Sequence, residues 1–415
     1  MRILVVTPDY PWPARLGTHL RSQQVVSTLA ALGDVDLFSL VYPGRPHPCE
    51  APAEVVLRRQ EVVARPAPAP ALGRRLRWLV TPRRPLDLIG GSYASVRRRF
   101  AAWVDGPYDL VWVGRPGTFD LLGWPRLGRT VVDLDDLEDQ KILARLRATP
   151  QTPSTGSVAA RTRRRVAAVQ ARRNAACWAS LQRRVARAVD TVVLAGADDV
   201  SRSGLGNAVL VPNGYTAPSR PVGRTEVGDP PVILFQGDMH YGPNTDGARW
   251  LVTEIAPLVR ARRPEVRIRL VGDPDGVVTR LHHPPEVTVV GMVDSMEAEL
   301  ARADMVAAPL RYASGTRLKI LEALAHRLPV VSTTVGAQGL GLESGRHLLL
   351  ADDAEAFAGA CLAVLGDEEL RTTLADEGEA EFLRCHQWSN ARERIRALVL
   401  GGALPPAPHG LVGRR

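Results

Sequence analysis

Tyr312-Ala-Ser-Gly-Thr-Arg-Leu-Lys-Ile-Leu-Glu-Ala-Leu-Ala325 is the stretch from which the rest of the chain can be interpreted. It follows an apolar run, 305–310, that is typical of a buried strand, and its own apolar spacing predicts a helix. The sequence therefore predicts a strand, a turn of small residues, and a helix with Arg317 and Lys319 in its first turn. Cations there oppose the helix dipole, and a bound anion such as a phosphate would offset that cost.

A solvated helix face is the alternative explanation for these two cations. Lys141 and Lys319 are the only lysines, so 51 of the 53 basic residues are arginine, and an arginine at position 317 is weak evidence. Lys319 and Glu322 could form a simple i,i+3 pair that contributes only ~0.2–0.5 kcal/mol. A lysine in a chain that otherwise avoids lysine is less easily explained in this way.

Outward from this stretch, short apolar runs alternate with longer helical stretches, which is typical of parallel sheets with crossover helices. The predicted strands of the first half are 2–7, 35–40, 110–113, 130–134 and 191–194. Those of the second half are 232–235, 267–271, 287–290, 305–309 and 329–332. The sequence thus predicts an α/β protein with two Rossmann-like, doubly wound domains.

Proline and glycine between the two strand series indicate the domain boundary. We expect an N-terminal domain at 1–215, a linker at 216–230, a C-terminal domain at 231–395 and a mobile tail at 396–415. Ligands bind at the carboxyl ends of the strands in such sheets, so the two domains are expected to face each other across a cleft.

Composition excludes several classes of protein. The four cysteines, Cys49, Cys177, Cys361 and Cys385, form no CxxC pair, which argues against zinc fingers and disulfide frameworks and fits a reducing, cytoplasmic setting. The apolar start of the chain is too short for a signal peptide, and no apolar stretch has spanning length. We expect a cytoplasmic protein.

The net charge of +9 is concentrated in one segment. Between Lys141 and Val189 there are twelve basic residues and no acidic one, and much of the segment has helical apolar spacing. A solvated surface helix, a face for anionic lipid or a phosphate-bearing acceptor, and a nucleic-acid-binding helix are the three interpretations. The solvated helix is the favoured interpretation, and peripheral contact with the inner membrane face is the second. No nucleic-acid-binding motif accompanies the segment, so nucleic acid is the least favoured of the three.

Six motifs in order carry a family likeness. They are Val211-Pro-Asn-Gly-Tyr215, Phe235-Gln-Gly-Asp-Met-His-Tyr-Gly-Pro-Asn244, Val289-Val-Gly-Met-Val293, the segment from Ser314 to Ala325, Pro329-Val-Val-Ser332 and Gly336-Ala-Gln-Gly339. Together with an amino-terminal strand and its glycine loop, this series resembles the retaining GT-B glycosyltransferases of the glycosyl transferases group 1, or family 4, type. The likeness covers about residues 1–390 and is strongest in the second half.

The resemblance implies a role for each matched position in binding a nucleotide-diphosphate sugar donor. Arg317 and Lys319 would be catalytic, since they would neutralise the leaving diphosphate. Gly237 would let the backbone approach the phosphates, Met292 and Val293 would lie near the base, and Glu322 would bind the ribose hydroxyls. Ser314, Gly315 and Thr316 would complete the donor site.

Two departures from the family pattern bear on activity. Ser314 stands where the first glutamate of the family's Glu-x7-Glu motif is expected, which puts the donor-sugar preference in question. Val111-Trp-Val-Gly-Arg-Pro116 lacks the histidine that many members carry there, and Arg115 occupies its neighbourhood.

Residues of the first domain are expected on the acceptor side of the cleft. Gly17 allows close backbone approach in the loop after the first strand, Arg21 could meet donor phosphate or acceptor, and Asp135 ends a strand in an Asp-x-Asp pattern. A metal site is the less favoured interpretation of that pattern, and a cleft-lining or helix-capping aspartate is preferred.

The resemblance implies a retaining, metal-independent hexosyl-type glycosyltransferase, which would have no metal site and no cofactor. The acceptor would be a lipid-linked glycan, a polysaccharide or a small natural product. A catalytically silent GT-B protein that regulates an active glycosyltransferase is the alternative, motivated by Ser314 and the missing histidine.

Overall fold

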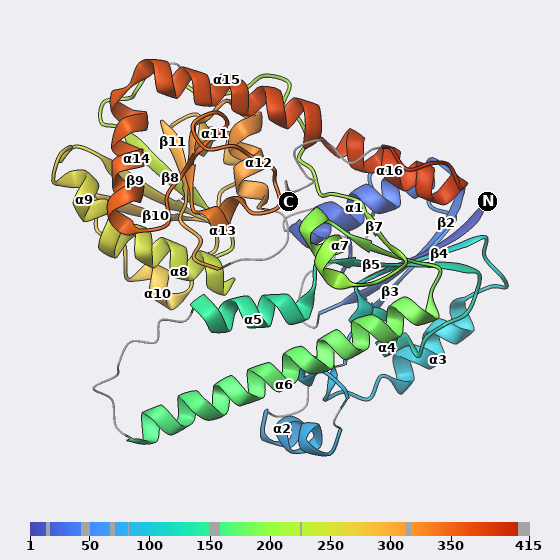
Figure 1. Cartoon of the computed structure of the whole chain (residues 1–415). Helices are drawn as coiled ribbons and strands as arrows, with labels where there is room; N and C mark the ends of the chain where they lie inside the picture. The colour runs from blue at the N-terminus through green and yellow to red at the C-terminus, as the bar shows by residue number, and fades with distance from the viewer. Residues whose placement is uncertain are drawn as a thin grey trace. The chain divides into compact units, whose positions relative to one another are not determined.

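The computed structural model describes residues 1–13, 17–42, 50–66, 71–81, 83–148, 158–224, 226–312 and 317–405. The chain divides into two compact units, one formed by Met1–Pro212 with Ala391–Pro405 and the other by Asn213–Asn390. Each unit is a parallel sheet with helices packed on it, as the alternation of apolar runs predicts (Figure 1).

The first unit has a seven-stranded sheet of order β3-β2-β1-β4-β5-β6-β7. Its strands are β1 Arg2–Thr7, β2 Asp34–Val41, β3 Arg59–Ala64, β4 Leu110–Gly114, β5 Arg129–Asp135, β6 Thr191–Leu194 and β7 Ala208–Leu210. Its helices are α1 Gly17–Ala30, α2 Ala71–Val80, η1 Leu86–Leu88, α3 Ala94–Trp103, α4 Pro116–Leu122, α5 Glu138–Ala148, α6 Val158–Ala188 and α7 Ala197–Ser203.

The second unit has a six-stranded sheet of order β10-β9-β8-β11-β12-β13. Its strands are β8 Val232–Gln236, β9 Arg267–Val271, β10 Val287–Gly291, β11 Met305–Ala308, β12 Val330–Ser332 and β13 Leu349–Leu350. Its helices are α8 Gly242–Trp250, η2 Leu251–Ile255, α9 Ala256–Arg260, α10 Gly276–Thr279, α11 Met296–Leu300, α12 Leu318–Ala325, α13 Thr334–Ala337, α14 Ala354–Gly366 and α15 Glu368–Cys385.

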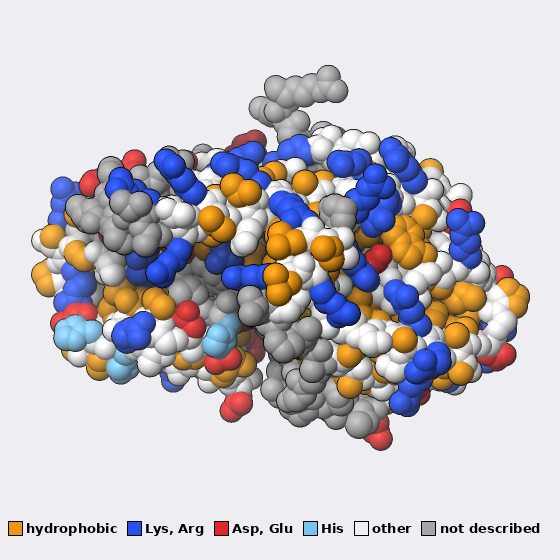
Figure 2. All heavy atoms as spheres, turned by 90° about the horizontal axis from the view of Figure 1, so that it is seen from below, with side chains coloured by type: hydrophobic (Ala, Val, Ile, Leu, Met, Phe, Trp, Pro, Cys, Tyr) orange, Lys and Arg blue, Asp and Glu red, His pale blue; other side chains and the backbone are white. Residues whose placement is uncertain are grey.

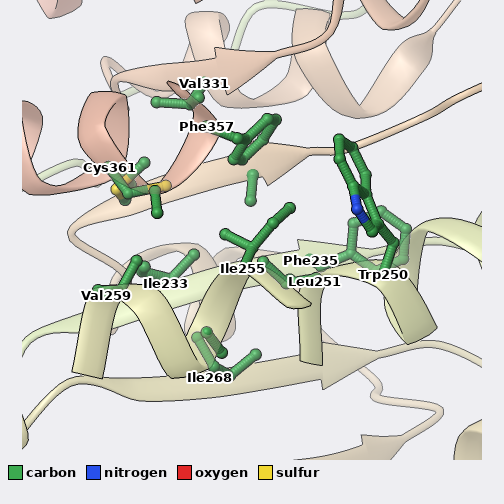
Figure 3. Packing of buried hydrophobic residues seen from close by; sticks show 14 of the residues in the cluster. Ile233, Phe235, Trp250, Leu251, Ile255, Val259, Ile268, Val331, Phe357 and Cys361 are labelled. Carbon is green, nitrogen blue, oxygen red and sulfur yellow. The ribbon is translucent and has the colours of Figure 1, made fainter. Parts of the chain in front are cut away.

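The core of the second unit lies on both faces of its sheet, because side chains alternate in direction along each strand. In β8, Ile233 and Phe235 pack into one cluster while Leu234 packs into the other. Figure 3 shows the first cluster, in which residues of the run from α8 to α9 pack with the strand residues and with Phe357 and Cys361 of α14. Burial on both faces fixes the position of the strand ends, where the candidate site lies.

All ten strands that the sequence predicts are present, with ends that differ by at most one or two residues. The three that it missed, β3, β7 and β13, are all edge strands. An edge strand is paired on one side only, and β3 (Arg-Gln-Glu-Val-Val-Ala) has little apolar character. Strands of this kind carry a weak hydrophobic signal.

The proline- and glycine-rich stretch after the first unit is held against the second unit. Tyr215 pairs with Gln387 in an isolated bridge, and the Gly223 N–H donates to the His326 carbonyl at 2.8 Å. Helix α16 (Trp388–Leu400) follows α15, so residues 396–400, which the sequence assigns to a tail, are helical. Hydrogen bonds hold α16 within the first unit: Arg394 Nε donates to Leu210 O, Arg392 Nε donates to Gln24 Oε1, and Arg129 donates to the Leu398 and Val399 carbonyls.

Candidate functional site

The candidate site lies at the carboxyl ends of the second sheet, where β8 and β11 are neighbours although β9 and β10 separate them in sequence. Such a switch in strand order opens a crevice at the strand ends, and ligands of open α/β sheets bind there. Gly237 directly follows β8, and Arg317 and Lys319 belong to the segment after β11. The fold therefore brings residues that are 80 positions apart in sequence to one place.

Gly237 leaves room at the end of β8 that no other residue would leave. Its φ of +146° is strained for any side chain, and its N–H donates to the Val271 carbonyl at 2.9 Å. A Cβ here would lie 2.7 Å from Asn244 Nδ2 and 3.3 Å from Lys319 Nζ. At the end of β9, a Cβ on Gly272 would lie 1.9 Å from the Gly237 carbonyl oxygen. The strand ends thus present bare backbone to a ligand.

Lys319 reaches from α12 to the turn after β8. Its Nζ donates to Asn244 Oδ1 at 2.8 Å and lies 3.9 Å from the centroid of the Phe235 ring. The Asn244 amide in turn donates to the Asp238 carbonyl at 2.8 Å, which fixes its oxygen toward the lysine. Burial lowers the pKa of Lys319 to about 7, and the nearby negative charge of Glu322 counteracts this only in part.

The other lysine, Lys141, has the opposite surroundings. Its Nζ lies 2.6 Å from Asp136 and 3.1 Å from Glu138. Burial alone would lower the pKa of Lys141, but Asp136 and Glu138 hold it above its ordinary value. Among the described residues, no carboxylate forms an ion pair with Lys319. Lys141 is compensated by the chain itself, whereas Lys319 has the surroundings expected of a cation that awaits an anionic ligand.

Glu322 lies one helical turn from Lys319 and is held by two donors. The Tyr215 hydroxyl donates to Oε1 at 2.9 Å, and Gln236 Nε2 donates to Oε2 at 3.3 Å. Burial raises the pKa of Glu322, and the hydrogen bonds from Tyr215 and Gln236 counteract that rise. Burial also raises the pKa of Tyr215, with Glu322 adding to the effect, so its hydroxyl stays a donor. Each carboxylate oxygen keeps a free acceptor position for a ligand hydroxyl.

Arg317 is the N-cap residue of α12, directly before the first turn. Its side chain is buried, and Nη2 donates to the Val335 carbonyl at 2.8 Å, in α13 after β12. The guanidinium is therefore at the carboxyl end of the sheet and not on the outer surface. Arg317 and Lys319 extend in different directions, toward β12 and β8 respectively, so that they flank the start of α12.

The remaining donor-side predictions have mixed outcomes. Met292 is exposed after β10, while Val293 is half-buried and packs against the core cluster of α12 and β11. Ser314, Gly315 and Thr316 lie outside the described residues. The three positions therefore stay predictions from the sequence.

In the first unit, Arg21 and Asp135 meet in a buried ion cluster at the carboxyl end of the sheet. Arg21 forms a bidentate pair with Asp133 at 2.8 and 2.9 Å and donates to the Val211 carbonyl at 3.1 Å. Arg115 Nη2 donates to Asp135 at 2.8 Å. Burial opposes the charge of Arg21, but Asp133 and Asp135 hold its pKa above its ordinary value. The aspartates are occupied by arginines, which disfavours the metal interpretation of this pattern.

A small cavity adjoins the cluster, at the point where β1 and β4 are neighbours. Its volume is about 20 Å³, enough for roughly one water molecule. Thr7, Arg21, Gly114 and Arg115 contribute to its lining. Gly17, the third residue predicted on this side, is the first residue of α1.

Sequence reasoning missed three side chains that complete the candidate site: Asn244, Gln236 and Tyr215. Asn244 orients the lysine, while Gln236 and Tyr215 orient the glutamate. All three lie within the motifs that carry the family likeness, and their place in those motifs is the signal by which the sequence could have indicated them. Gln236 Oε1 is buried without a partner among the described residues, so it is a further acceptor at this place.

The candidate site of the second unit thus combines the backbone of a glycine, a lysine that forms no ion pair with a described carboxylate, and an oriented carboxylate. Backbone at Gly237 and the charge of Lys319 suit a phosphate group. The carboxylate of Glu322 suits a pair of neighbouring hydroxyls, as on a sugar. Among the described residues, no group of three or more His, Cys, Asp or Glu side chains could hold a metal ion.

One family model matches part of the second unit. Residues 230–367 match the family model of the glycosyl transferases group 1. A 44.6 kDa uncharacterized protein of the cps region of Klebsiella pneumoniae is 25% identical over 135 residues, which covers 30% of this chain and 35% of that protein. The match thus spans about a third of the relative's length.

Solved structures resemble the whole chain. Sucrose-phosphate synthase from Thermosynechococcus elongatus has a TM-score of 0.65 at 17% identity, covering 97% of this chain and 98% of its own. WaaG, a glycosyltransferase of lipopolysaccharide biosynthesis, has a TM-score of 0.62 at 14% identity, covering 97% and 100%. Anabaena HepE, in complex with UDP and glucose, has a TM-score of 0.59 at 15% identity, covering 96% and 99%. The predicted GT-B fold, with two Rossmann-like domains, is confirmed.

Proposed function

We propose that this protein is a glycosyltransferase that moves a sugar from a nucleotide-diphosphate donor to a hydroxyl acceptor, with retention of anomeric configuration and without a divalent metal. Residues 230–367 form a glycosyl transferases group 1 domain. The observation that carries the proposal is the place of Lys319, which forms no ion pair with a described carboxylate, beside Gly237 at the switch point of that domain.

In the proposed reaction, the bond between the anomeric carbon and the β-phosphate oxygen breaks, and the acceptor oxygen forms a bond to that carbon. The acceptor's proton passes to the departing phosphate oxygen, on the same face, so no protein base is required. Negative charge builds up on the diphosphate as the bond breaks. Lys319 and Arg317 stabilise that charge from fixed positions, which is the usual source of the largest rate gain in such sites.

Glu322 is proposed to accept hydrogen bonds from the donor's ribose hydroxyls. Glu322→Gln keeps the shape but removes the charge and replaces one acceptor oxygen by a donor. A hydrogen bond to a charged group is worth about 1.5–3 kcal/mol, so the donor KM should rise on the order of tenfold or more, with a smaller change in kcat. Steady-state kinetics with varied donor measure this effect. Glu369→Gln, an exposed position on α15, is the control and should leave KM unchanged.

Binding of a nucleoside diphosphate should be coupled to proton uptake by Lys319. The pKa of Lys319 is about 7 in the ligand-free protein, and a bound diphosphate raises it, because the anion favours the charged ammonium. At a pH well above 7 the free protein has a neutral lysine, whereas the complex has a charged one. Affinity should therefore fall as the pH rises from 7 upward, by up to about tenfold per pH unit.

Calorimetric titration with UDP at about pH 8.5, in two buffers of different ionisation enthalpy, measures that uptake. The diphosphate itself has a last pKa of about 6, so it is already fully ionised at this pH and takes up no proton. An uptake approaching one proton is expected for the wild type and none for Lys319→Met. Equal heats in both buffers for the wild type would mean that no proton is taken up on binding, which would contradict the proposed coupling to Lys319.

The activity itself is tested by incubating the protein with UDP-glucose and other nucleotide sugars and measuring release of the nucleoside diphosphate. UDP-sugars come first because HepE was solved with UDP-glucose. Release that survives a chelator supports the metal-free transferase. Silence with every donor, together with thermal stabilisation by a nucleoside diphosphate, would instead favour a binding protein without catalytic activity.

A further inference from the structure

Helix α2 turns an apolar stripe away from the protein. Leu76, Leu79 and Val80 follow the i, i+3, i+4 spacing of one helix face and are 58%, 61% and 78% exposed. Among the side chains of α2 whose burial is described, the buried one is Trp78, on the other face. A helix normally packs its apolar stripe against the core and exposes the other side. On α2 the aliphatic stripe is outside, which indicates a surface made for a partner.

The first half of α6 continues this surface. Arg173 of α6 lies 4.3 Å from the Trp78 ring centroid and donates to the Trp78 carbonyl at 2.7 Å, so the two helices are side by side (Figure 1). Val166 and Val169, an i,i+3 pair, are 50% and 63% exposed. Residues 161–167 are exposed around the whole helix. This half of α6 thus adds a second aliphatic pair to that of α2.

The charge around these aliphatic side chains has one sign. No acidic residue occurs at 62–86 or at 142–189. The exposed arginines of α2 and of the first half of α6, up to residue 172, are Arg75, Arg77, Arg161, Arg163, Arg164, Arg165 and Arg172. Figure 2, seen from below, shows arginine and hydrophobic side chains interspersed over the visible surface. We call the exposed side chains of 75–80 and 161–172 the α2/α6 surface.

We propose that the α2/α6 surface is a membrane-docking site that binds bilayers containing anionic lipid. Arginines attract the lipid headgroups, and the aliphatic side chains between them insert into the boundary of the acyl region. This proposal goes beyond the transfer reaction and concerns the other unit, so either one can fail without the other. It also extends the sequence-based expectation for 141–189, since α2, which the sequence did not single out, supplies most of the apolar contact.

Two other occupants fit the same surface less well. A second copy of the chain would bring two clusters of arginines together, and like charges in contact oppose association. A nucleic acid would use the arginines, but single strands also need exposed aromatic rings for stacking, and the aromatic residue of α2, Trp78, is buried. Exposed aliphatic side chains next to cations fit a lipid surface. No described helix is long and apolar enough to span the membrane, so docking would be from one side.

The test is flotation of the full-length protein with phosphatidylcholine vesicles, with and without phosphatidylglycerol. The wild type should bind the phosphatidylglycerol vesicles at about 0.1 M salt, bind more weakly at about 1 M, and bind pure phosphatidylcholine least. Replacing three arginines (Arg75→Glu, Arg77→Glu and Arg164→Glu) should lower partitioning on the order of 100-fold or more. Replacing the aliphatic stripe (Leu76→Ser, Leu79→Ser and Val80→Ser) should lower it on the order of tenfold or more, and should abolish the part that survives high salt.

The matched control carries the same charge reversal on exposed arginines of the second unit: Arg220→Glu, Arg262→Glu and Arg280→Glu. It should float like the wild type, which separates a local surface from net charge. All substituted positions are on the surface, and an unchanged thermal unfolding curve verifies folding. The proposal is overturned if the wild type does not float at low salt, or if the control loses as much binding as the α2/α6 variants. Tighter binding to single-stranded RNA than to vesicles, unaffected by the serine variant, would also overturn it.

Discussion

Lys319→Met should lower the rate of donor cleavage by about 10²–10³-fold, the typical loss when one preorganised charge-stabilising donor is removed from a site. Methionine keeps an unbranched side chain but removes the ammonium group, which lies over the Phe235 ring and donates to Asn244. The loss should fall on kcat as well as on KM, because the diphosphate gains charge as the sugar departs. Release of nucleoside diphosphate under saturating and limiting donor measures both parameters.

The same variant should be more stable than the wild type, which separates a functional role from a structural one. The pKa of Lys319 is about 7 in the folded protein against an ordinary value of 10.5. Between these two values the unfolded chain holds a proton that the folded chain must give up, so the lysine destabilises the fold in that window. Removing it should raise the thermal midpoint at pH 7 to 8. Functional groups held in unfavourable surroundings commonly show this trade between stability and activity.

Lys141→Met is the matched control, since it replaces the other lysine of the chain. It removes the partner of Asp136 and Glu138, so it should lower the thermal midpoint and leave the affinity of the second unit for UDP unchanged. Arg317→Met should also slow donor cleavage, because its guanidinium lies at the same helix start. A Lys319→Met protein that cleaves donor at the wild-type rate would remove the lysine from the site.

The second large effect is on stability. Arg21→Met should destabilise the first unit by about 3–5 kcal/mol, the typical cost of breaking a buried ion pair from one side. Asp133 and Asp135 are buried, and without Arg21 the bidentate partner of Asp133 is lost. Burial already raises the pKa of Asp133, and Arg21 is the main influence that lowers it. Urea unfolding of the variant should show a lower midpoint.

A double variant tells whether Arg21 acts through Asp133 or on a substrate. Arg21→Met with Asp133→Asn removes both charges, and such paired removal is often nearly neutral for stability. Most of the lost stability should therefore return. The sequence suggests that Arg21 meets donor or acceptor, whereas the contacts favour a structural ion cluster. A single variant that unfolds at the wild-type urea concentration but loses activity would restore the sequence-based interpretation.

The sequence was sufficient for the fold because the central strands are buried on both faces. Runs such as 232–235 and Met305–Ala308 are apolar throughout, and their order with helices between them dictates a parallel sheet. The edge strand Arg59–Ala64 begins with three polar residues and is less buried, so its apolar signal is too weak to predict a strand. Register and neighbour order, as between β8 and β11, depend on tertiary packing and came only from the structure.

For the candidate site, the motifs pointed to the residues proposed to contact the donor better than to the residues that orient them. Gly237, Lys319 and Glu322 lie together as expected. Their partners Asn244 and Tyr215 are close in space and distant in sequence, so no spacing rule connects them to Lys319 or Glu322. The surroundings that set the pKa of Lys319, its burial and the charge of Glu322 one turn away, are likewise a property of the folded unit.

The most direct test of the account is a crystal structure of the protein soaked with UDP. We expect diphosphate density at the end of β8 and the ribose hydroxyls at Glu322. A phosphate oxygen should lie at about 3 Å from Lys319 Nζ, the usual hydrogen-bond length. Ordered UDP bound elsewhere on the second unit, with Lys319 still bonded to Asn244 alone, would contradict it.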